Sequence, residues 1–346
     1  MKFKKLNKLR NRFCRLRHTQ DLAKLLEVPA YKLQLIAQQP KYHIFSIPKK
    51  DGSKRWIEDP ETRLKKIQRT LNKYLQACYF FARTEAAYGF LINPKKDPEP
   101  RNILTNAQKH LGATWLMNLD IEDFFHQVKA KTVATIFTAS PFEFNIELTE
   151  VLVGLMTHQG RLPMGAPTSP VLSNFATREM DEQLLALAKW GGWTYTRFAD
   201  DMSFSSLTPL DDTSMGKVSQ IIDDYGFQFN KEKIRLFKPG DLKEVTGLII
   251  GEKEVTIPTV FLTSLEKDLE KLQQLKQVQQ RFNKASKWVD KFEEQMHGSV
   301  TFINFIMGED NPVSEKFSNK LEQSLYPVED FEQVSWDDFP YWSQSV

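Results

Sequence analysis

Tyr195-Thr196-Arg197-Phe198-Ala199-Asp200-Asp201-Met202-Ser203-Phe204-Ser205 is the stretch of sequence that decides the fold. Residues alternate in character on both sides of the paired aspartates, and a period of two is typical of strands joined by a tight turn. A hairpin with two adjacent carboxylates at its tip concentrates negative charge, which repulsion disfavours unless a cation offsets it. Aspartate is also a common turn residue, so a solvated acidic turn is the alternative at this point.

A third aspartate stands in a similar setting upstream. Residues 114–121 are mostly apolar and predict a buried strand, with Asp120 near its end. An unpaired carboxylate is costly to bury unless it binds a cation or has a partner. Magnesium prefers oxygen ligands and completes its shell with water and substrate phosphates. Carboxylates from two strands therefore favour a pair of magnesium ions, which in phosphoryl transfer lie about 3.5–4 Å apart.

Composition sets the scale of the protein. The chain has 346 residues, 41% of them hydrophobic, which is enough for a sizeable core and two or three structural units. The net charge of +3 is small, but the first seventeen residues hold eight Lys and Arg and no acid, whereas acids gather near the other end. This distribution suggests a polyanion at the basic end, with a solvated amphipathic start as the alternative.

Cysteine usage and the absence of targeting signals point to the cell interior. Only Cys14 and Cys78 are present, too few and too far apart in sequence to predict a disulfide framework or a zinc site. The basic start is not followed by an apolar core segment, as a secretory signal would be. No apolar run approaches the roughly 20 residues that a membrane span needs. We therefore expect a soluble, cytoplasmic protein without a membrane partner.

A second hairpin is predicted near the start of the chain. Residues 43–48 and 53–57 are short strand-like runs around Asp51-Gly52, a dipeptide that strongly favours a hairpin turn. Basic residues flank this turn, and they either protect an exposed strand edge or close over a triphosphate. The residues alone leave both interpretations open.

Helices are predicted around these hairpins. Residues 1–40 and 61–82 carry apolar residues near helical spacing, with Pro29 as a break in the first range. The Gly- and Pro-rich residues 161–170 lead into another helix, and their small side chains let a nucleobase or template backbone approach closely. Residues 262–282 predict a further amphipathic helix. The aromatic residues that follow it are expected in its core, namely Trp288, Phe292, Phe302 and Phe305.

The order of these pieces resembles the palm of a reverse transcriptase. The Asp120 strand is followed by Gly165-Ala166-Pro167-Thr168-Ser169-Pro170, then by Phe198-Ala199-Asp200-Asp201, then by residues 226–233. Phe198 stands where the family usually has Tyr, and Met164 stands where it usually has Gln. An ordered series of motifs is far more specific than any one of them.

Two further motifs resemble those of bacterial retron reverse transcriptases. Asn106-Ala107-Gln108-Lys109-His110 matches an Asn-Ala-x-x-His element, and Val245-Thr246-Gly247 matches a Val-Thr-Gly element. The resemblance covers residues 43–250 and implies RNA and DNA contacts at Asn106, His110, Val245, Thr246 and Gly247.

The resemblance implies an α+β right-hand polymerase, with fingers, a palm built on a mixed β-sheet, and a helical thumb. The implied domains are a basic helical N-terminal extension at 1–40, fingers at 41–111, a palm with interleaved fingers elements at 112–250, a helical RNA-binding thumb at 251–325, and an acidic aromatic tail at 326–346.

The resemblance also implies the site residues. Asp120, Asp200 and Asp201 would be the catalytic carboxylates, holding two Mg2+ ions together with the backbone carbonyl of Ile121. An aromatic gate against the sugar 2′-hydroxyl would exclude ribonucleotides, because a ring under C2′ cannot satisfy a hydroxyl. The implied deoxynucleotide site consists of Lys54, Arg55, Phe125 as the gate, Gly165 and Lys233.

The implied activity is RNA-directed DNA synthesis. A retron enzyme would make branched RNA–DNA (msDNA) from its cognate structured noncoding RNA, primed from a guanosine 2′-OH, as part of antiphage defence. Its partners would be that RNA, the msDNA, deoxynucleotides and a separate effector protein, and the resemblance allows a higher-order assembly. The alternatives are a reverse transcriptase of intron or diversity-generating type, and a scaffolding protein that binds RNA–DNA and holds an effector inactive.

Overall fold

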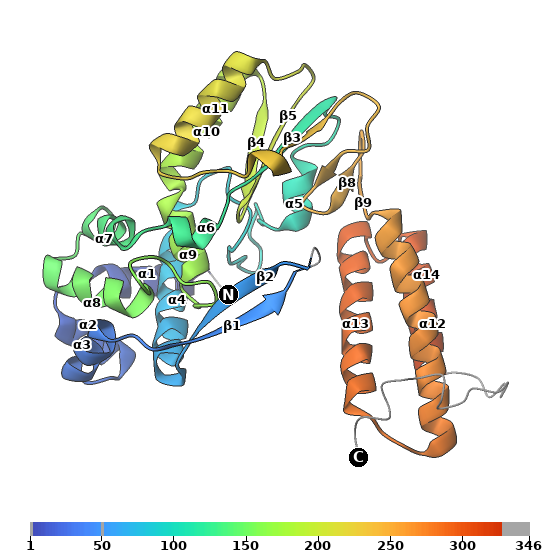
Figure 1. The fold of residues 1–346 in the computed structure, drawn as a ribbon, viewed down its shortest axis with the longest axis horizontal. Helices are drawn as coiled ribbons and strands as arrows, with labels where there is room; N and C mark the ends of the chain where they lie inside the picture. Colours follow the sequence, from blue (N-terminus) through green and yellow to red (C-terminus); the bar gives the residue numbers. More distant parts are fainter. Residues whose placement is uncertain (1–2, 50–51, 327–346) are drawn as a thin grey trace. The chain divides into compact units, whose positions relative to one another are not determined.

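The chain folds into two compact units that divide between Asp241 and Leu242 (Figure 1). The structure is a computed structural model that describes residues 3–49 and 52–326. Lys50, Asp51 and residues 327–346, which include most of the predicted acidic aromatic tail, lie outside the described residues. The division falls inside the range expected for the palm, and the assignment of fingers, palm and thumb stays a prediction.

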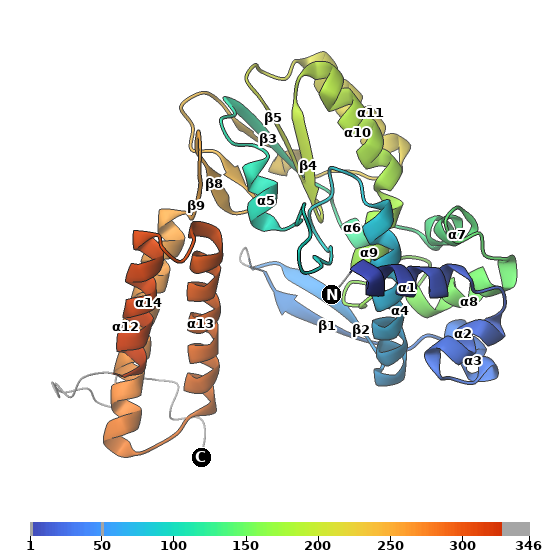
Figure 2. The ribbon, with the colours of Figure 1, turned by 180° about the vertical axis from the view of Figure 1, so that it is seen from behind.

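The first unit is built on a four-stranded sheet in the order β4-β5-β3-β6. Its three ladders are antiparallel, and an isolated parallel bridge between Ala87 and Arg197 adds to them. Helices α10 and α11 cover one side of this sheet and α5 lies on the other (Figure 2). The strands are β3 (Trp115–Asp120), β4 (Thr194–Phe198), β5 (Asp201–Ser206) and β6 (Arg235–Phe237).

The predicted N-terminal hairpin is confirmed. Strands β1 (Tyr42–Pro48) and β2 (Lys54–Pro60) pair antiparallel and form a separate two-stranded arm beside the helices (Figure 1). Many side chains of the arm are exposed, including Ile44, Phe45 and Trp56. An arm with so little core of its own depends on its base for its position.

Helix α4 (Thr62–Ala82) forms the centre of the core of the first unit. Its apolar residues recur at helical spacing and are buried, as the amphipathic pattern predicts. The other helices of this unit are α1 (Phe3–Cys14), α2 (Thr19–Leu26), α3 (Ala30–Gln38), α5 (Ile103–Gln108), α6 (Phe124–Gln127), α7 (Ala130–Thr138), α8 (Ile146–Met156), α9 (Ser169–Ala176), α10 (Arg178–Gly191) and α11 (Asp212–Asp224).

The second unit joins a small sheet to three helices. The order of its strands is β7-β8-β9. One face of α12 is buried through leucines at helical spacing, such as Leu265, Leu269 and Leu272, which confirms the predicted amphipathic helix. The elements are β7 (Glu244–Val245), β8 (Leu248–Ile250), β9 (Val255–Thr256), α12 (Thr259–Phe282), α13 (Lys287–Met307) and α14 (Pro312–Leu325).

The expected core position of the α13 aromatics is wrong for two of them. Trp288 is 46% exposed and Phe305 is 48% exposed. Trp288 stacks on Phe292 with ring centroids 5.4 Å apart, and the Lys271 ammonium lies 5.6 Å from the Trp288 ring. Helical spacing indicates which residues share a face of a helix, but it does not say whether a neighbour covers that face.

None of the helices in the described part of the chain is long and apolar enough to cross a membrane.

Candidate active site

The paired aspartates lie at a two-residue turn between β4 and β5, as predicted. Phe198 and Asp201 are paired across the hairpin, so Ala199 and Asp200 form the turn between them. Ala199 has φ +60°, a left-handed conformation that is uncommon for a residue with a Cβ. Such a conformation persists only where surrounding contacts impose it.

A buried arginine supplies those contacts. Arg197 is 0% exposed, and its guanidinium donates to both Asp181 carboxylate oxygens at 2.9 and 2.7 Å. It also donates to the carbonyl oxygen of Ala199 at 2.8 Å. From the other side, a Cβ added to Gly89 would lie 2.5 Å from the Ala199 nitrogen, so only glycine fits there. The sequence did not single out these supporting residues, because no local pattern marks them.

The structure brings the three predicted carboxylates together. Asp120 is the cross-strand partner of Asp201 in the antiparallel β3–β5 ladder. The Ile121 N–H donates to the Asp200 carbonyl oxygen at 3.0 Å, which ties the end of β3 to the turn. Two aspartates from one hairpin and a third from the neighbouring strand thus share one end of the sheet.

Crowding of these carboxylates changes their protonation. Burial, followed by the charge of Asp120, raises the pKa of Asp200. Burial and the charges of Asp200 and Asp120 raise the pKa of Asp201 to about 6. An acid whose folded-state pKa is raised adds stability at low pH, and this stability is lost as the pH rises through that pKa. The ionised carboxylates therefore lower the stability of the folded protein, and a bound cation would restore it.

Two of the predicted triphosphate-binding residues act on this cluster. Lys233 donates to Asp120 Oδ2 at 2.7 Å, and this hydrogen bond is the main cause that raises the pKa of Lys233. The positive charge of Arg55 on β2 lowers the pKa of Asp200, opposing the effect of burial. Lys54 precedes Arg55 on the same strand, and neighbouring strand residues point to opposite faces. The geometry therefore supports Arg55 more than Lys54.

The donor chemistry of the cluster fits magnesium. No group of three or more His, Cys, Asp or Glu side chains within residues 3–49 and 52–326 forms a ready metal-binding set. Asp120 and Asp200, with the nearby Asp201 and the backbone of Ile121, offer hard oxygen donors only. Mg2+ takes one or two carboxylates and completes its shell with substrate phosphates, so an incomplete protein set suits it.

The predicted sugar gate, Phe125, follows Asp120 by five residues in the sequence. Phe125 is on α6, which follows β3 after a short connection, and it is partly buried. Its ring centroid is 5.9 Å from that of Phe90 and 5.6 Å from that of Phe124. The aromatic neighbours hold the ring in place, and its role as a gate stays a prediction.

Gly165 lies where the 161–170 loop meets β2. It has φ +121°, and an added Cβ would lie 3.0 Å from Ile57 Cγ2 and 3.1 Å from the Glu58 carbonyl oxygen. Both the backbone conformation and the close approach of β2 therefore require glycine. Met164, which replaces the family's usual Gln, accepts a hydrogen bond from the Glu58 N–H at its carbonyl oxygen and donates its own N–H to the Glu58 carboxylate.

Glu58 is a supporting residue that sequence reasoning missed. It is buried, and its carboxylate accepts hydrogen bonds from Arg161 at 2.9 and 3.1 Å, from the Met164 N–H at 3.1 Å and from His126 at 3.0 Å. Burial raises its pKa, but these hydrogen bonds outweigh burial and lower the pKa overall. One carboxylate thus fixes the base of the β1–β2 arm to the Gly165 loop and to α6.

Glu58→Gln is expected to lower the free energy of unfolding by about 1–3 kcal/mol at neutral pH, because the buried partners lose a charged acceptor. A depressed carboxyl pKa adds stability that is lost as the pH falls through that pKa, so the wild type should become less stable as the pH falls below the ordinary glutamate value of 4.5. Urea denaturation at neutral pH and below that value checks both points. The variant should lose less stability than the wild type as the pH falls. An equal loss of stability in both proteins would contradict the role of the Glu58 carboxylate. Glu61→Gln, at the exposed start of α4, is the matched control.

The Asn106 and His110 side chains of the Asn-Ala-x-x-His motif lie inside the protein. His110 is 1% exposed, and its ring nitrogens lie 2.7 Å from Ser205 Oγ and 2.7 Å from Thr196 Oγ1. Burial lowers its pKa to about 3, so the imidazole is neutral. Asn106 is also 1% exposed. Protein covers both side chains, and the hydrogen bonds of His110 fasten the end of α5 to β4 and β5. The RNA and DNA contacts expected of Asn106 and His110 stay a prediction.

The Val-Thr-Gly element forms a turn in the second unit. Val245 is buried and pairs with Leu248, so Thr246 and Gly247 make a two-residue hairpin loop. Their φ angles are +49° and +83°, and a hairpin with two positive φ values favours glycine. Val245 is covered by protein, and nucleic-acid contacts at the three residues of this element stay a prediction.

His110→Leu is expected to cost about 1–3 kcal/mol of stability, because two buried hydroxyls lose their partner. Thermal or urea unfolding measures the loss. His110→Gln keeps one hydrogen-bonding group and should lose less. If the leucine variant is as stable as the wild type, His110 does not fasten α5 to the sheet.

The comparisons with known proteins agree with this geometry. Residues 47–262 match the family model described as reverse transcriptase (RNA-dependent DNA polymerase). The chain is 30% identical over 253 residues to the Retron Ec86 reverse transcriptase of Escherichia coli, covering 69% of this chain and 72% of that protein. It is 30% identical to the Retron Mx162 reverse transcriptase of Myxococcus xanthus, covering 67% of this chain and 53% of that protein.

The Retron Mx65 reverse transcriptase of Myxococcus xanthus is 31% identical over 61% of this chain and 51% of its own length. The chain thus spans about half the length of the two Myxococcus relatives. Among solved structures, telomerase from Candida albicans in complex with a fragment of telomeric RNA aligns with a TM-score of 0.42 at 11% identity, covering 87% of this chain and 68% of that chain. The family model and the Escherichia coli relative confirm the resemblance predicted from the motifs. The chain belongs to the reverse transcriptase family and, within it, to the retron reverse transcriptases.

Proposed function

We propose that the protein is an RNA-directed DNA polymerase that adds deoxynucleotides to a growing strand on an RNA template. The observation that carries the proposal is the meeting of Asp120, Asp200 and Asp201 at one end of the sheet, with raised pKa values at the turn. Carboxylates gathered this closely repel one another, so the cluster destabilises the fold unless it serves a cation or a substrate.

Magnesium is the proposed cofactor, as a pair of ions. Asp120 and Asp200 would hold both ions, with Asp201 supporting one of them and the carbonyl of Ile121 as a further ligand. When bound, the ions supply charge stabilisation to the attacking and leaving oxygens.

Side chains around the three aspartates bind the triphosphate and stabilise the leaving pyrophosphate in this proposal. In the reaction, a hydroxyl oxygen bonds to the α-phosphorus, the bond to the β-phosphate breaks, and pyrophosphate leaves while the hydroxyl gives up its proton. Arg55 binds the triphosphate through its planar fork of donors. Lys233, which neutralises Asp120 in the present structure, turns to the developing charge of the pyrophosphate.

Phe125 selects the sugar in this proposal. Phe125→Ala is expected to reduce discrimination against ribonucleotides by about tenfold to a hundredfold, the range for apolar shape selection in a pocket. The ratio of kcat/KM for a deoxynucleotide and its ribonucleotide measures the effect. Phe81→Ala, an exposed phenylalanine on α4, is the control. Unchanged discrimination would remove Phe125 from the gate.

The retron class of the chain narrows the proposed product. The proposed product is branched RNA–DNA made on a cognate structured RNA, with a guanosine 2′-OH as the first nucleophile, as the resemblance of the motifs to retron reverse transcriptases implies. A separate effector protein and a role in antiphage defence complete the proposal. In the second unit, the exposed Trp288 stacks on the partly buried Phe292 beside Lys271. This arrangement suits a nucleic acid, since bases stack on aromatic rings and phosphates pair with lysine.

One extraction experiment tests this proposal. The full chain is purified from its native locus, and its bound nucleic acid is digested separately with RNase and DNase, beside the Asp200→Ala, Asp201→Ala variant. We expect short DNA joined covalently to RNA in the wild type and RNA alone in the variant. An enzyme that carries no DNA but extends an ordinary primer on RNA belongs to another functional type, such as the intron or diversity-generating enzymes. Absence of both activities would favour a scaffolding protein.

A further inference from the structure

The two cysteines of the chain meet in the folded protein. Cys14 ends α1 and Cys78 lies within α4, 64 positions later, yet their Sγ atoms are 3.9 Å apart. Their separation in sequence gave no reason to pair them. The packing of α1 along α4 brings them together.

We propose that Cys14 and Cys78 are an oxidation site, which a peroxide converts into a disulfide that joins α1 to α4. The proposal stands independently of the polymerase assignment. The sulfur atoms are already in contact, so an approach of about 2 Å completes the bond. Since both residues belong to one folded unit, the bond forms within one chain.

The two thiols differ in access and reactivity. Cys78 is fully buried, whereas Cys14 is partly exposed, so a dissolved oxidant reaches Cys14 first. A hydrogen bond from Cys78 lowers the pKa of Cys14 to about 7, with help from the charges of Arg10 and Arg17 and against the effect of burial. The thiolate is the form that attacks an oxidant, so Cys14 is the reactive member of the pair.

The chemistry balances in two steps. The Cys14 thiolate attacks one peroxide oxygen, so an S–O bond forms, the O–O bond breaks and hydroxide leaves, giving a sulfenic acid. The Cys78 sulfur then attacks the Cys14 sulfur, so the S–S bond forms and the S–O bond breaks. The Cys78 proton leaves with the second hydroxide as water. Each sulfur is oxidised by one electron, and hydrogen peroxide is reduced to two molecules of water.

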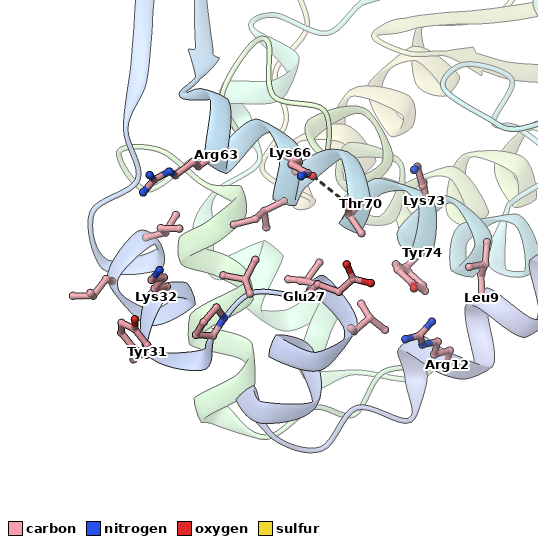
Figure 3. A pocket seen from close by; sticks show the side chains of 17 residues that line it. Leu9, Arg12, Glu27, Tyr31, Lys32, Arg63, Lys66, Thr70, Lys73 and Tyr74 are labelled. Carbon is pink, nitrogen blue, oxygen red and sulfur yellow. Dashed lines mark hydrogen bonds between the residues drawn. The ribbon is translucent and has the colours of Figure 1, made fainter.

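The disulfide would fix a wall of a surface hollow. The hollow has a volume of about 870 Å³. Figure 3 labels Arg12 of α1 and Lys73 and Tyr74 of α4 among the side chains around it. Both linked helices therefore line the same space. Oxidation would hold the basic helix α1 against α4, so amide hydrogen exchange in α1 should slow.

The test uses the full chain, reduced and then freed of reductant. Hydrogen peroxide is added, and the intact mass, the number of free thiols after unfolding, and the protease peptide map are measured. We expect the mass to fall by two hydrogen atoms, both thiols to disappear together, and one peptide pair to link α1 to α4. Dithiothreitol should restore both thiols and the faster exchange of α1.

Two single variants complete the design. Cys78→Ser should leave Cys14 open to sulfenic and sulfinic acid formation without a cross-link. Cys14→Ser should leave Cys78 unreacted while the protein is folded. The wild type alone decides the proposal if either variant fails to fold. Persistence of both thiols in excess peroxide, sulfinic acid at Cys14 beside a free Cys78, or linkage between two chains would each overturn it.

Discussion

Asp200→Asn is expected to lower RNA-templated DNA synthesis by at least about a thousandfold, because in the proposed mechanism Asp200 is a charged metal ligand and asparagine is not. The change keeps the shape of the side chain, so the turn between β4 and β5 should persist. Initial rates of single-nucleotide addition on an RNA template, at saturating Mg2+ and deoxynucleotide, measure the loss.

The melting temperature of the variant shows whether the loss of activity is due to misfolding. The pKa of Asp200 is raised in the folded protein, so its ionised form costs stability at neutral pH. An uncharged asparagine should therefore leave the melting temperature equal or slightly higher, even as activity falls. Asp224→Asn, at an exposed position at the end of α11, is the matched control and should keep full activity. Activity within about tenfold of the wild type would refute the role of Asp200 in the metal centre.

Arg197→Met is expected to lower the free energy of unfolding by about 3–5 kcal/mol, because it leaves the buried Asp181 carboxylate without its cationic partner. The variant also loses the hydrogen bond to the Ala199 carbonyl, which supports the left-handed turn. DNA synthesis should therefore fall in the fraction of protein that remains folded. Urea denaturation gives the stability, and rates corrected for the folded fraction give the second effect.

Two variants act as controls for this prediction. Arg178→Met removes a partly exposed arginine whose nearest carboxylate oxygen is 4.0 Å away, and it should cost less than about 1 kcal/mol. Arg197→Met combined with Asp181→Leu removes both charges and should be more stable than Arg197→Met alone. If the single and double variants are equally stable, the buried ion pair does not explain the loss.

The sequence predicted those parts of the site that have a local signature. The alternation on both sides of Asp200-Asp201 predicted the β4–β5 hairpin, and the apolar run before Asp120 predicted β3. Each pattern extends over about ten consecutive residues, so it can be recognised from the local sequence alone. The order of the motifs then identified the family before any geometry was known.

Parts of the site that depend on distant contacts were not predicted. Glu58 looks like an ordinary strand residue, and only the folded chain brings Arg161 and Met164 to it. From its sequence neighbours, Arg197 would be expected on the surface of a strand, yet it is buried in the core, where it forms an ion pair with Asp181. His110 fits a motif that suggested nucleic-acid contact, but its partners are hydroxyls of β4 and β5. In each case the partner lies on another element, so no local periodicity reveals it.

The strand order β4-β5-β3-β6 determines how much of the chain must be synthesised before the three aspartates can come together. The ribosome makes β3 first, whereas both of its neighbours in the sheet, β5 and β6, come much later in the chain. A nascent chain that ends before Asp200 carries Asp120 without its companions, and one that ends before Lys233 lacks the cation that neutralises Asp120. Long-range pairing of this kind is slow, because the intervening chain must first be ordered. Under the proposed function, synthesis of nearly the whole first unit must therefore precede nucleotide binding and the copying of RNA.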